Sequence, residues 1–213
     1  MNKKATKWVV ITGLDGSGKT SLVSNIVSWL EEKDLKVLRD RFPHDEYLVK
    51  KLLDKSKDSY TDRLLFALDN RLFGTEIKEV MKSNKYDFIV TQRGFLDSFV
   101  HGSVQGYSYS LIEELNHLSD MPKCTIMIHL VCDAQTAYLR ICNDPEADKF
   151  EYPAYMTKQE RETRRAFTEV SSETNQDLEH FKGTVNFYVD TTQMTIQEVF
   201  EYVKLKLEKE LNL

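Results

Sequence analysis

Residues 13–20 read GLDGSGKT, and this stretch decides the fold. It fits the phosphate-loop pattern G-x-x-x-x-G-K-[ST]. The apolar run WVVI at residues 8–11 precedes it and predicts a buried strand, and apolar residues at helical spacing follow it from Ser21 onward. A strand, a glycine-rich loop and a helix in this order form the setting in which the pattern binds nucleotide phosphates. We therefore expect a nucleoside triphosphate to bind here.

Each residue type in this loop has a chemical reason. The glycines let the chain turn sharply and bring backbone N–H groups against an anion, and the helix start adds unpaired N–H groups and a partial positive charge. Lys19 can reach the β- and γ-phosphates, and Thr20 can hold Mg²⁺. A glycine turn before an ordinary helix is the alternative, and the complete pattern in its expected setting argues against it. The expected residues for binding this nucleotide are Gly13, Asp15, Gly16, Ser17, Gly18, Lys19, Thr20 and Ser21.

The bulk properties of the chain narrow its class and its partners. Its 213 residues suffice for one α/β domain, expected to span residues 1–213. The formal net charge of -5 makes a nucleic-acid polymer an unexpected partner. Apolar runs fall short of the roughly 20 residues that span a membrane, and no cleavable signal pattern begins the chain. The three cysteines lack metal-ligand spacing, which indicates buried or free thiols in a reducing cytoplasm.

Strands alternate with helices along the sequence. Strands are predicted at 7–12, 36–38, 87–91, 124–131 and 184–189. Helices are predicted at 19–33, 45–55, 110–119 and 133–142, from Ser59 or Thr61 to 83, from Thr157 onward, and from a cap at Thr195 to the end. The helix that ends at 83 has Leu64, Leu68 and Leu72 among its apolar positions, residues 92–109 are expected to be rich in loops, and residues 143–157 to form a lid. This order predicts a P-loop NTPase-type three-layer sandwich, in which helices cover both faces of a five-stranded parallel sheet.

Ligands of such sheets bind beyond the carboxyl ends of the strands. The informative residues are therefore those that directly follow each predicted strand. They are residues 13–20, Arg41, residues 92–93, residues 131–133 and residues 190–193.

Several of these segments together resemble the thymidylate kinase family of phosphate-loop nucleoside monophosphate kinases. The similar segments are residues 13–20 with the acidic Asp15, RFP at 41–43, LLFA at 64–67 followed by Asn70 and Arg71, VTQR at 90–93 followed by DS at 97–98 and QGY at 105–107, residues 137–140 followed by 148–151, and DTT at 190–192. The resemblance extends over nearly the whole chain from the first strand onward.

The resemblance implies a role for residues at the monophosphate site. Arg41 and Arg93 would bind the substrate phosphate, since a guanidinium fork suits that geometry; surface salt bridges are the alternative. Phe66 would stack on the base, with a core phenylalanine as the alternative. Arg71 would donate to a base carbonyl, Gln105 would read the base edge, and Asp15 would accept from a sugar hydroxyl or only stabilise the loop. The expected substrate-binding residues are Asp15, Arg41, Phe42, Phe66, Asn70, Arg71, Arg93 and Gln105.

Three positions depart from the family pattern. Gln92 stands where the family usually has an aspartate, and an amide can orient a magnesium-bound water without adding negative charge. Val131 replaces the acidic residue that often ends the fourth strand. Lys149 replaces a lid arginine, so a point charge replaces a planar fork. Weaker metal binding, a substituting carboxylate and a changed substrate all stay open.

The source of the catalytic positive charge is a separate expectation. Lys19 is the only basic residue of the loop, and charge that develops on the transferred phosphoryl group needs neutralising. Basic residues gather from 140 to 165, where they either close over the phosphates from a lid or form a solvated charged helix face. The expected catalytic residues are Lys19, Arg93, Arg140, Arg161 and Arg164.

The sequence therefore predicts phosphoryl transfer from ATP, with Mg²⁺, to a deoxynucleoside monophosphate, with dTMP first, giving dTDP. A nucleotide-binding protein that has lost the reaction and a kinase for a modified pyrimidine monophosphate remain alternatives. The family is typically homodimeric, so the resemblance implies a homodimer that binds small nucleotides.

Overall fold

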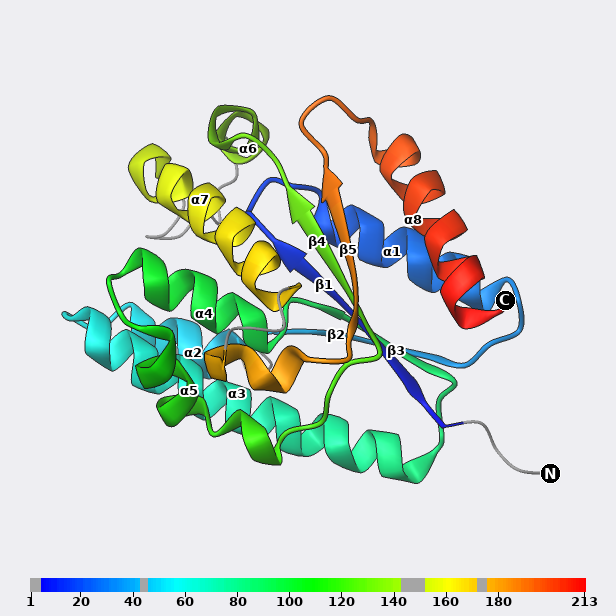
Figure 1. Ribbon diagram of the computed structural model, residues 1–213, viewed down its shortest axis with the longest axis horizontal. Helices are drawn as coiled ribbons and strands as arrows, with labels where there is room; N and C mark the ends of the chain where they lie inside the picture. Colours follow the sequence, from blue (N-terminus) through cyan, green and yellow to red (C-terminus); the bar gives the residue numbers. More distant parts are fainter. Residues whose placement is uncertain (1–4, 43–45, 143–151, 172–175) are drawn as a thin grey trace.

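A five-stranded, all-parallel sheet runs through the middle of the molecule (Figure 1). The computed structural model describes residues 5–42, 46–142, 152–171 and 176–213. The strands are β1 (Lys7–Gly13), β2 (Val37–Arg41), β3 (Phe88–Gln92), β4 (Ile126–Val131) and β5 (Val185–Asp190), in the spatial order β2-β3-β1-β4-β5. The predicted number and direction of strands are confirmed.

The central strands are apolar throughout because helices cover both of their faces. Every residue of β4 is buried, and so are all but the last residue of β3 and the first residue of β1. The edge strand β2 carries Arg39, Asp40 and Arg41 and is half exposed. All strands point the same way, so the residues that follow them meet at one edge of the sheet.

One face of the sheet is covered by α1 (Lys19–Glu31) and α8 (Ile196–Leu211), which lie side by side in Figure 1. Leu22, Ile26 and Leu30 of α1 pack with Val203 and Leu207 of α8 over the sheet. A capping box starts α8: Thr195 accepts from the Glu198 backbone, and Glu198 accepts from Thr195. The predicted Thr195 cap is confirmed.

The opposite face is covered by α3 (Ser59–Ser83), α4 (Phe95–Val104), α5 (Tyr109–Asn116) and α7 (Pro153–Val170) (Figure 1). Their core is aromatic, with Trp8 making edge-on contacts to Phe73 at 5.9 Å and to Phe95 at 5.8 Å between ring centroids. The short helices α2 (Glu46–Leu53) and α6 (Ala134–Ile141) pack against α3 and α7, and two 3₁₀ turns, η1 (Leu118–Asp120) and η2 (Gln176–Phe181), complete this layer. Among the described residues, no helix is long and apolar enough to cross a membrane.

Three predictions about helix positions were wrong. The segment expected to be loop contains α4, because its glycines lie at the ends or against a neighbour: a Cβ at Gly102 would lie 2.5 Å from Cδ1 of Ile112. Helix α7 begins at Pro153 instead of Thr157, since proline suits the first turn of a helix. The cap of α3 is Asp58, whose carboxylate accepts from Thr61 N. Of the expected lid, residues 143–151 lie outside the described residues.

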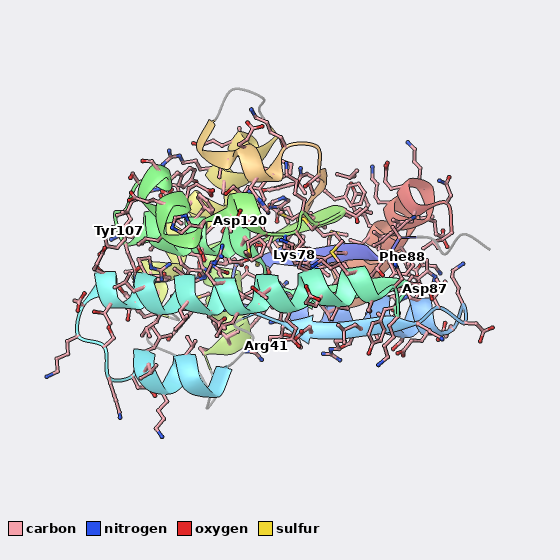
Figure 2. All side chains as sticks on the ribbon, turned by 90° about the horizontal axis from the view of Figure 1, so that it is seen from below. Arg41, Lys78, Asp87, Phe88, Tyr107 and Asp120 are labelled. Atoms are coloured by element: carbon pink, nitrogen blue, oxygen red, sulfur yellow. The ribbon has the colours of Figure 1, made fainter. Side chains whose placement is uncertain are left out.

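Helix α3 departs from the expected pattern in its first half, although the predicted apolar position Ile77 is buried. It buries Asp62, Arg63, Asp69 and Asn70 toward the other helices. It exposes Leu64, Leu68 and Leu72, each about half accessible, although the sequence indicated them as the packed face. Figure 2 shows α3 crossing the underside of the molecule, with Tyr107 beside its first turns, where Ser59 Oγ and the Tyr107 hydroxyl lie 2.8 Å apart. Two features of α3 therefore need an explanation: its buried polar side chains and its exposed leucines.

Candidate active site

The phosphate loop joins β1 to α1 in a conformation that only glycine allows. Gly13 has φ +137°, and a Cβ there would lie 1.9 Å from the Leu130 carbonyl oxygen. Gly16 has φ +77°, and a Cβ there would lie 2.3 Å from the Ala137 carbonyl oxygen. The loop is therefore pressed against β4 and α6, and the first turn of α1 that follows it offers backbone N–H groups to an anion.

Lys19 is held inside this loop. Its Nζ donates to the carbonyl oxygens of Gly13 at 2.9 Å and Leu14 at 2.8 Å, and to Asp15 Oδ1 at 2.9 Å. Burial lowers the pKa of Lys19, and the Asp15 carboxylate opposes that shift. The ammonium thus already faces the inside of the loop, where it can exchange these partners for phosphate oxygens.

Asp15 joins the loop to the end of β3. Its Oδ1 accepts from the Arg93 guanidinium as well as from Lys19. Burial by itself would raise the pKa of Asp15, but the charges of Arg93 and Lys19 outweigh it and hold that pKa well below its ordinary value. Arg93 occupies the left-handed region at φ 70°, a strained conformation of the kind found at functional sites. The structure therefore brings Asp15, Lys19 and Arg93 together.

Thr20 and Gln92 place two oxygen ligands side by side. The Thr20 hydroxyl donates to Gln92 Oε1 at 3.1 Å, at the open end of the loop. Hydroxyl and amide oxygens suit Mg²⁺, which also keeps water and phosphate ligands. Val131 at the end of β4 is buried and offers none, and the described residues contain no group of three acidic, histidine or cysteine side chains that could hold a metal. The pair fits a nucleotide-bound magnesium ion.

Helix α4 contributes two polar side chains that were not among the expected site residues, because residues 92–109 were predicted to be rich in loops. Asp97 is buried and accepts from Thr12 Oγ1 at 2.7 Å and from Gly94 N at 3.0 Å, and burial raises its pKa. One turn later, His101 Nδ1 lies 2.9 Å from the Tyr155 hydroxyl of α7. Burial, followed by the charge of Arg93, lowers the pKa of His101 to about 3, so the imidazole is neutral. Helical spacing of Asp97 and His101 was the signal that could have revealed them.

Helix α3 supplies a second group of buried polar side chains. Asn70 donates from Nδ2 to Ser98 Oγ at 2.6 Å and to Asn116 Oδ1, so it ties α3 to α4 and α5. Phe66 is half buried, with the guanidinium of Arg63 4.7 Å from its ring centroid. Arg63 was not among the expected site residues. Arg71 points elsewhere: it donates to the His117 carbonyl at 3.1 Å, away from this group.

The remaining expected substrate residues are dispersed. Arg41 lies exposed at the end of β2, opposite Gln92 in the parallel ladder, and is labelled in Figure 2. Phe42 is buried in the core, where its ring centroid lies 5.6 Å from that of Phe73. Gln105 ends α4, and its Oε1 is buried without a hydrogen-bond partner among the described residues.

Of the expected catalytic arginines near the lid, Arg140 contacts the phosphate loop. It donates to the carbonyl oxygens of Gly16 at 3.3 Å and Thr191 at 3.0 Å, and so links the loop to the end of β5. Arg164 pairs with Glu160 at 3.1 Å and with Asp190 at 3.2 Å. Arg161 is largely exposed and pairs with Glu162 at 3.1 Å. The structure thus brings one of the three to the loop.

Comparison with known proteins decides the family. A family model described as thymidylate kinase matches residues 11–199, which include every side chain placed at the site above. The chain belongs to the thymidylate kinase family. It is 30% identical to a probable thymidylate kinase of Pyrobaculum aerophilum over 71% of this chain and 78% of that protein. It is 28% identical to probable thymidylate kinase 1 of Saccharolobus solfataricus over 96% of this chain and 98% of that protein.

A third relative, the thymidylate kinase of Bacillus anthracis, is 28% identical over 64% of this chain and 70% of that protein. The thymidylate kinase family consists of ATP-dependent nucleoside monophosphate kinases, so the predicted fold class and enzyme class are confirmed. In this chain the phosphate loop follows β1 and Arg93 directly follows β3.

Proposed function

We propose that this chain transfers the γ-phosphate of ATP to dTMP and forms dTDP. The observation that carries the proposal is the convergence of Lys19 from the phosphate loop and Arg93 from the end of β3 on the single carboxylate of Asp15. A donor triphosphate on the loop and an acceptor monophosphate beside Arg93 would meet at this point. The names of the relatives support dTMP as the acceptor.

In this reaction the chain acts by positioning and by neutralising charge. An oxygen of the acceptor phosphate forms the new bond to the γ-phosphorus, and the bond from that phosphorus to the bridging oxygen of ADP breaks. Lys19 and Arg93 offset negative charge on the transferred group. Asp15 is ionised and can accept a hydrogen bond from a sugar hydroxyl. Thr20 would bind Mg²⁺, and Gln92 would orient a water molecule bound to that ion. The ion would neutralise charge on the donor phosphates.

The acceptor contacts follow from the same placement. We assign the substrate phosphate to Arg93 and to the exposed Arg41, at the ends of neighbouring strands β3 and β2. Phe66 offers an aromatic face for the base. Arg140, which already touches the phosphate loop, is our candidate for an additional cation on the donor side. The three free cysteines accord with a cytoplasmic enzyme.

We also propose that the enzyme is a homodimer formed through α3. Leu64, Leu68 and Leu72 recur every four residues, so they form one exposed apolar stripe along that helix. Leu52 of α2 and Tyr60 of α3 are further large apolar side chains exposed on this pair of packed helices. A stripe on a straight helix can pack against its own copy about a two-fold axis, which is the commonest arrangement of homo-oligomers.

A coupled assay of ADP formation against a panel of nucleoside monophosphates tests the proposed function. We expect ATP-dependent turnover with dTMP, and Lys19→Ala should lower it by orders of magnitude, as removal of a transition-state cation does elsewhere. Lys33→Ala is the matched control and should keep normal turnover, because Lys33 is exposed in the turn that follows α1. A wild-type enzyme that phosphorylates no monophosphate, or a fully active Lys19→Ala variant, would refute the assignment.

A further inference from the structure

Helix α3 carries an arginine that the described fold does not satisfy. Arg63 is 4% exposed, although arginine is rarely buried without partners. Its Nη1 reaches the Ser98 carbonyl oxygen at 3.5 Å, which is longer than the roughly 2.7–3.2 Å of an ordinary N–H···O hydrogen bond. Its Nε and Nη2 are buried and have no hydrogen-bond partner in the described part of the chain. Unpaired buried donors cost free energy, so a ligand that accepts from them would be bound there.

The position of Arg63 relates it to the active site. The Arg63 guanidinium approaches the Ser98 carbonyl of α4. Asp97, the residue before Ser98, accepts from Thr12 of β1, and α4 begins just after Arg93. Arg63 therefore contacts the helix that starts at the active site, and we place the base of a nucleotide whose phosphate lies at Arg93 along this helix.

The aromatic environment of Arg63 also suits a base. Its guanidinium lies 4.7 Å from the centroid of the Phe66 ring. Tyr155 of α7 and Tyr107, in the loop between α4 and α5, are within electrostatic range of it. Aromatic rings of this kind bind the faces of a nucleobase by stacking, while a planar guanidinium donates to the edge of the base.

An unpaired acceptor lies on the adjacent helix. Gln105 Oε1 is buried without a partner among the described residues, and the Gln105 backbone N–H donates to the Gly102 carbonyl at 3.1 Å. Gly102 packs against the stem of Arg63, since a Cβ on it would lie 3.6 Å from the Arg63 Cδ. Gly102 therefore relates the two groups: the stem of Arg63, which carries the unpaired donors, packs against it, and Gln105, which carries the unpaired acceptor, is three residues beyond it.

We infer that Arg63 is a specificity-determining residue that selects a 4-oxo pyrimidine together with Gln105. The guanidinium donates to the carbonyl oxygen at C4, and Gln105 Oε1 accepts from N3–H. A 4-amino pyrimidine presents a donor at C4 and no hydrogen at N3, so it leaves both protein groups unpaired. The inference rests on the proposed monophosphate kinase activity and assigns to Arg63 the base contact that the family resemblance implied for Arg71.

A matched pair of substrates isolates this contact. dTMP and 5-methyl-dCMP share the sugar, the phosphate and the 5-methyl group and differ at the C4 and N3 edge. We expect the wild type to prefer dTMP. Arg63→Gln should lower kcat/KM for dTMP by roughly 10- to 100-fold, the effect of losing hydrogen bonds to a charged donor. The loss for 5-methyl-dCMP should be much smaller, so the ratio of kcat/KM for dTMP to kcat/KM for 5-methyl-dCMP should fall. The KM for ATP should stay unchanged.

Two further variants serve as comparisons on the same helix. Lys78→Gln removes an exposed positive charge that donates to the Asp120 carbonyl (Figure 2), and it should leave the substrate ratio at the wild-type value. Arg71→Gln tests the competing assignment. A narrowed ratio in Arg71→Gln combined with a normal ratio in Arg63→Gln would overturn the inference.

The inference also has a test that needs no turnover. Stabilisation of the protein against heat by dTMP alone should exceed that by 5-methyl-dCMP, and Arg63→Gln should abolish the difference. An equal loss for both nucleotides in Arg63→Gln would assign Arg63 a structural role and refute the inference. An inactive wild type that still distinguishes the two nucleotides would refute the proposed function and support the role of Arg63.

Discussion

At the scale of single residues, the site is built from charges that share partners. Asp15 accepts from both Lys19 and Arg93, so each cation is fixed by the same carboxylate and neither is neutralised fully. Binding a nucleotide replaces protein partners with phosphate and sugar groups at fixed positions. This preorganisation is what a phosphoryl transfer enzyme requires, since most of its effect comes from positioning.

The neutral His101 makes the free energy of unfolding of the protein depend on pH. Its pKa is lowered from 6.5 to about 3 by burial and by nearby Arg93. Between these values the unfolded chain binds a proton that the native protein does not, so stability is complete above pH 6.5 and falls as pH decreases toward 3. His101→Gln should reduce the slope of unfolding free energy against pH by one proton, about 1.4 kcal/mol per pH unit.

Urea unfolding at pH 7.5, 6.0 and 5.0 measures this slope. His129 and His180, whose pKa values burial lowers to about 4, contribute in the same direction and are present in both proteins, so the difference between wild type and His101→Gln isolates His101. Identical slopes would show that His101 takes up a proton in the native state.

At the scale of elements, α3 serves two surfaces at once. Its buried side carries Arg63, Asn70 and the half-buried Phe66, while its outer side carries the leucine stripe. Leu68→Glu should therefore separate the proposed dimer, because a carboxylate in the middle of the stripe would be desolvated without a partner. Sedimentation velocity measures the change from dimer to monomer.

Leu205→Glu on α8 is the control, since Leu205 is 66% exposed on a helix of the opposite layer. It should leave the sedimentation coefficient at the wild-type value. A wild type that sediments as a monomer, or a Leu68→Glu variant that stays dimeric, would contradict an α3 interface.

The sequence predicts an element well when that element is determined by its own residues, and poorly when it depends on contacts with distant parts of the chain. The phosphate loop was predictable because Gly13, Gly16 and Lys19 act through their own backbone and immediate neighbours. Helix α4 was not, because Gly102 has low helix propensity and is accepted here where a Cβ would meet Ile112, while Gly94 precedes the helix as its cap. The buried Arg63 was also hidden, since a charged residue on an apparently amphipathic helix is normally exposed.

At the scale of the whole molecule, the two helical layers share one sheet and should unfold together. The two tryptophans report on them separately: Trp8 belongs to the core under α3 and α4, and Trp29 belongs to the core under α1 and α8. In Trp8→Phe the fluorescence follows Trp29, and in Trp29→Phe it follows Trp8. In each variant the fluorescence midpoint in urea should coincide with the midpoint by far-UV circular dichroism.

Separate midpoints within one variant would show that the layers unfold independently. The control is the unmutated protein, whose combined fluorescence should give one transition at the midpoint of its dichroism. We expect coincidence because β1 contributes side chains to both cores, with Val9 and Ile11 on one face and Trp8 and Val10 on the other.

The central place of β1 has a consequence for how the chain is made. This strand is made before the other four, yet it hydrogen-bonds to β3 and β4, which lie about 80 and 117 residues further along. Until residue 131 has emerged, β1 has an unpaired edge and an apolar surface, and at about 5–20 residues per second that interval lasts many seconds. The nascent chain is therefore most in need of chaperones before β4 arrives, and a slow stretch of translation just before that strand would prolong its exposure.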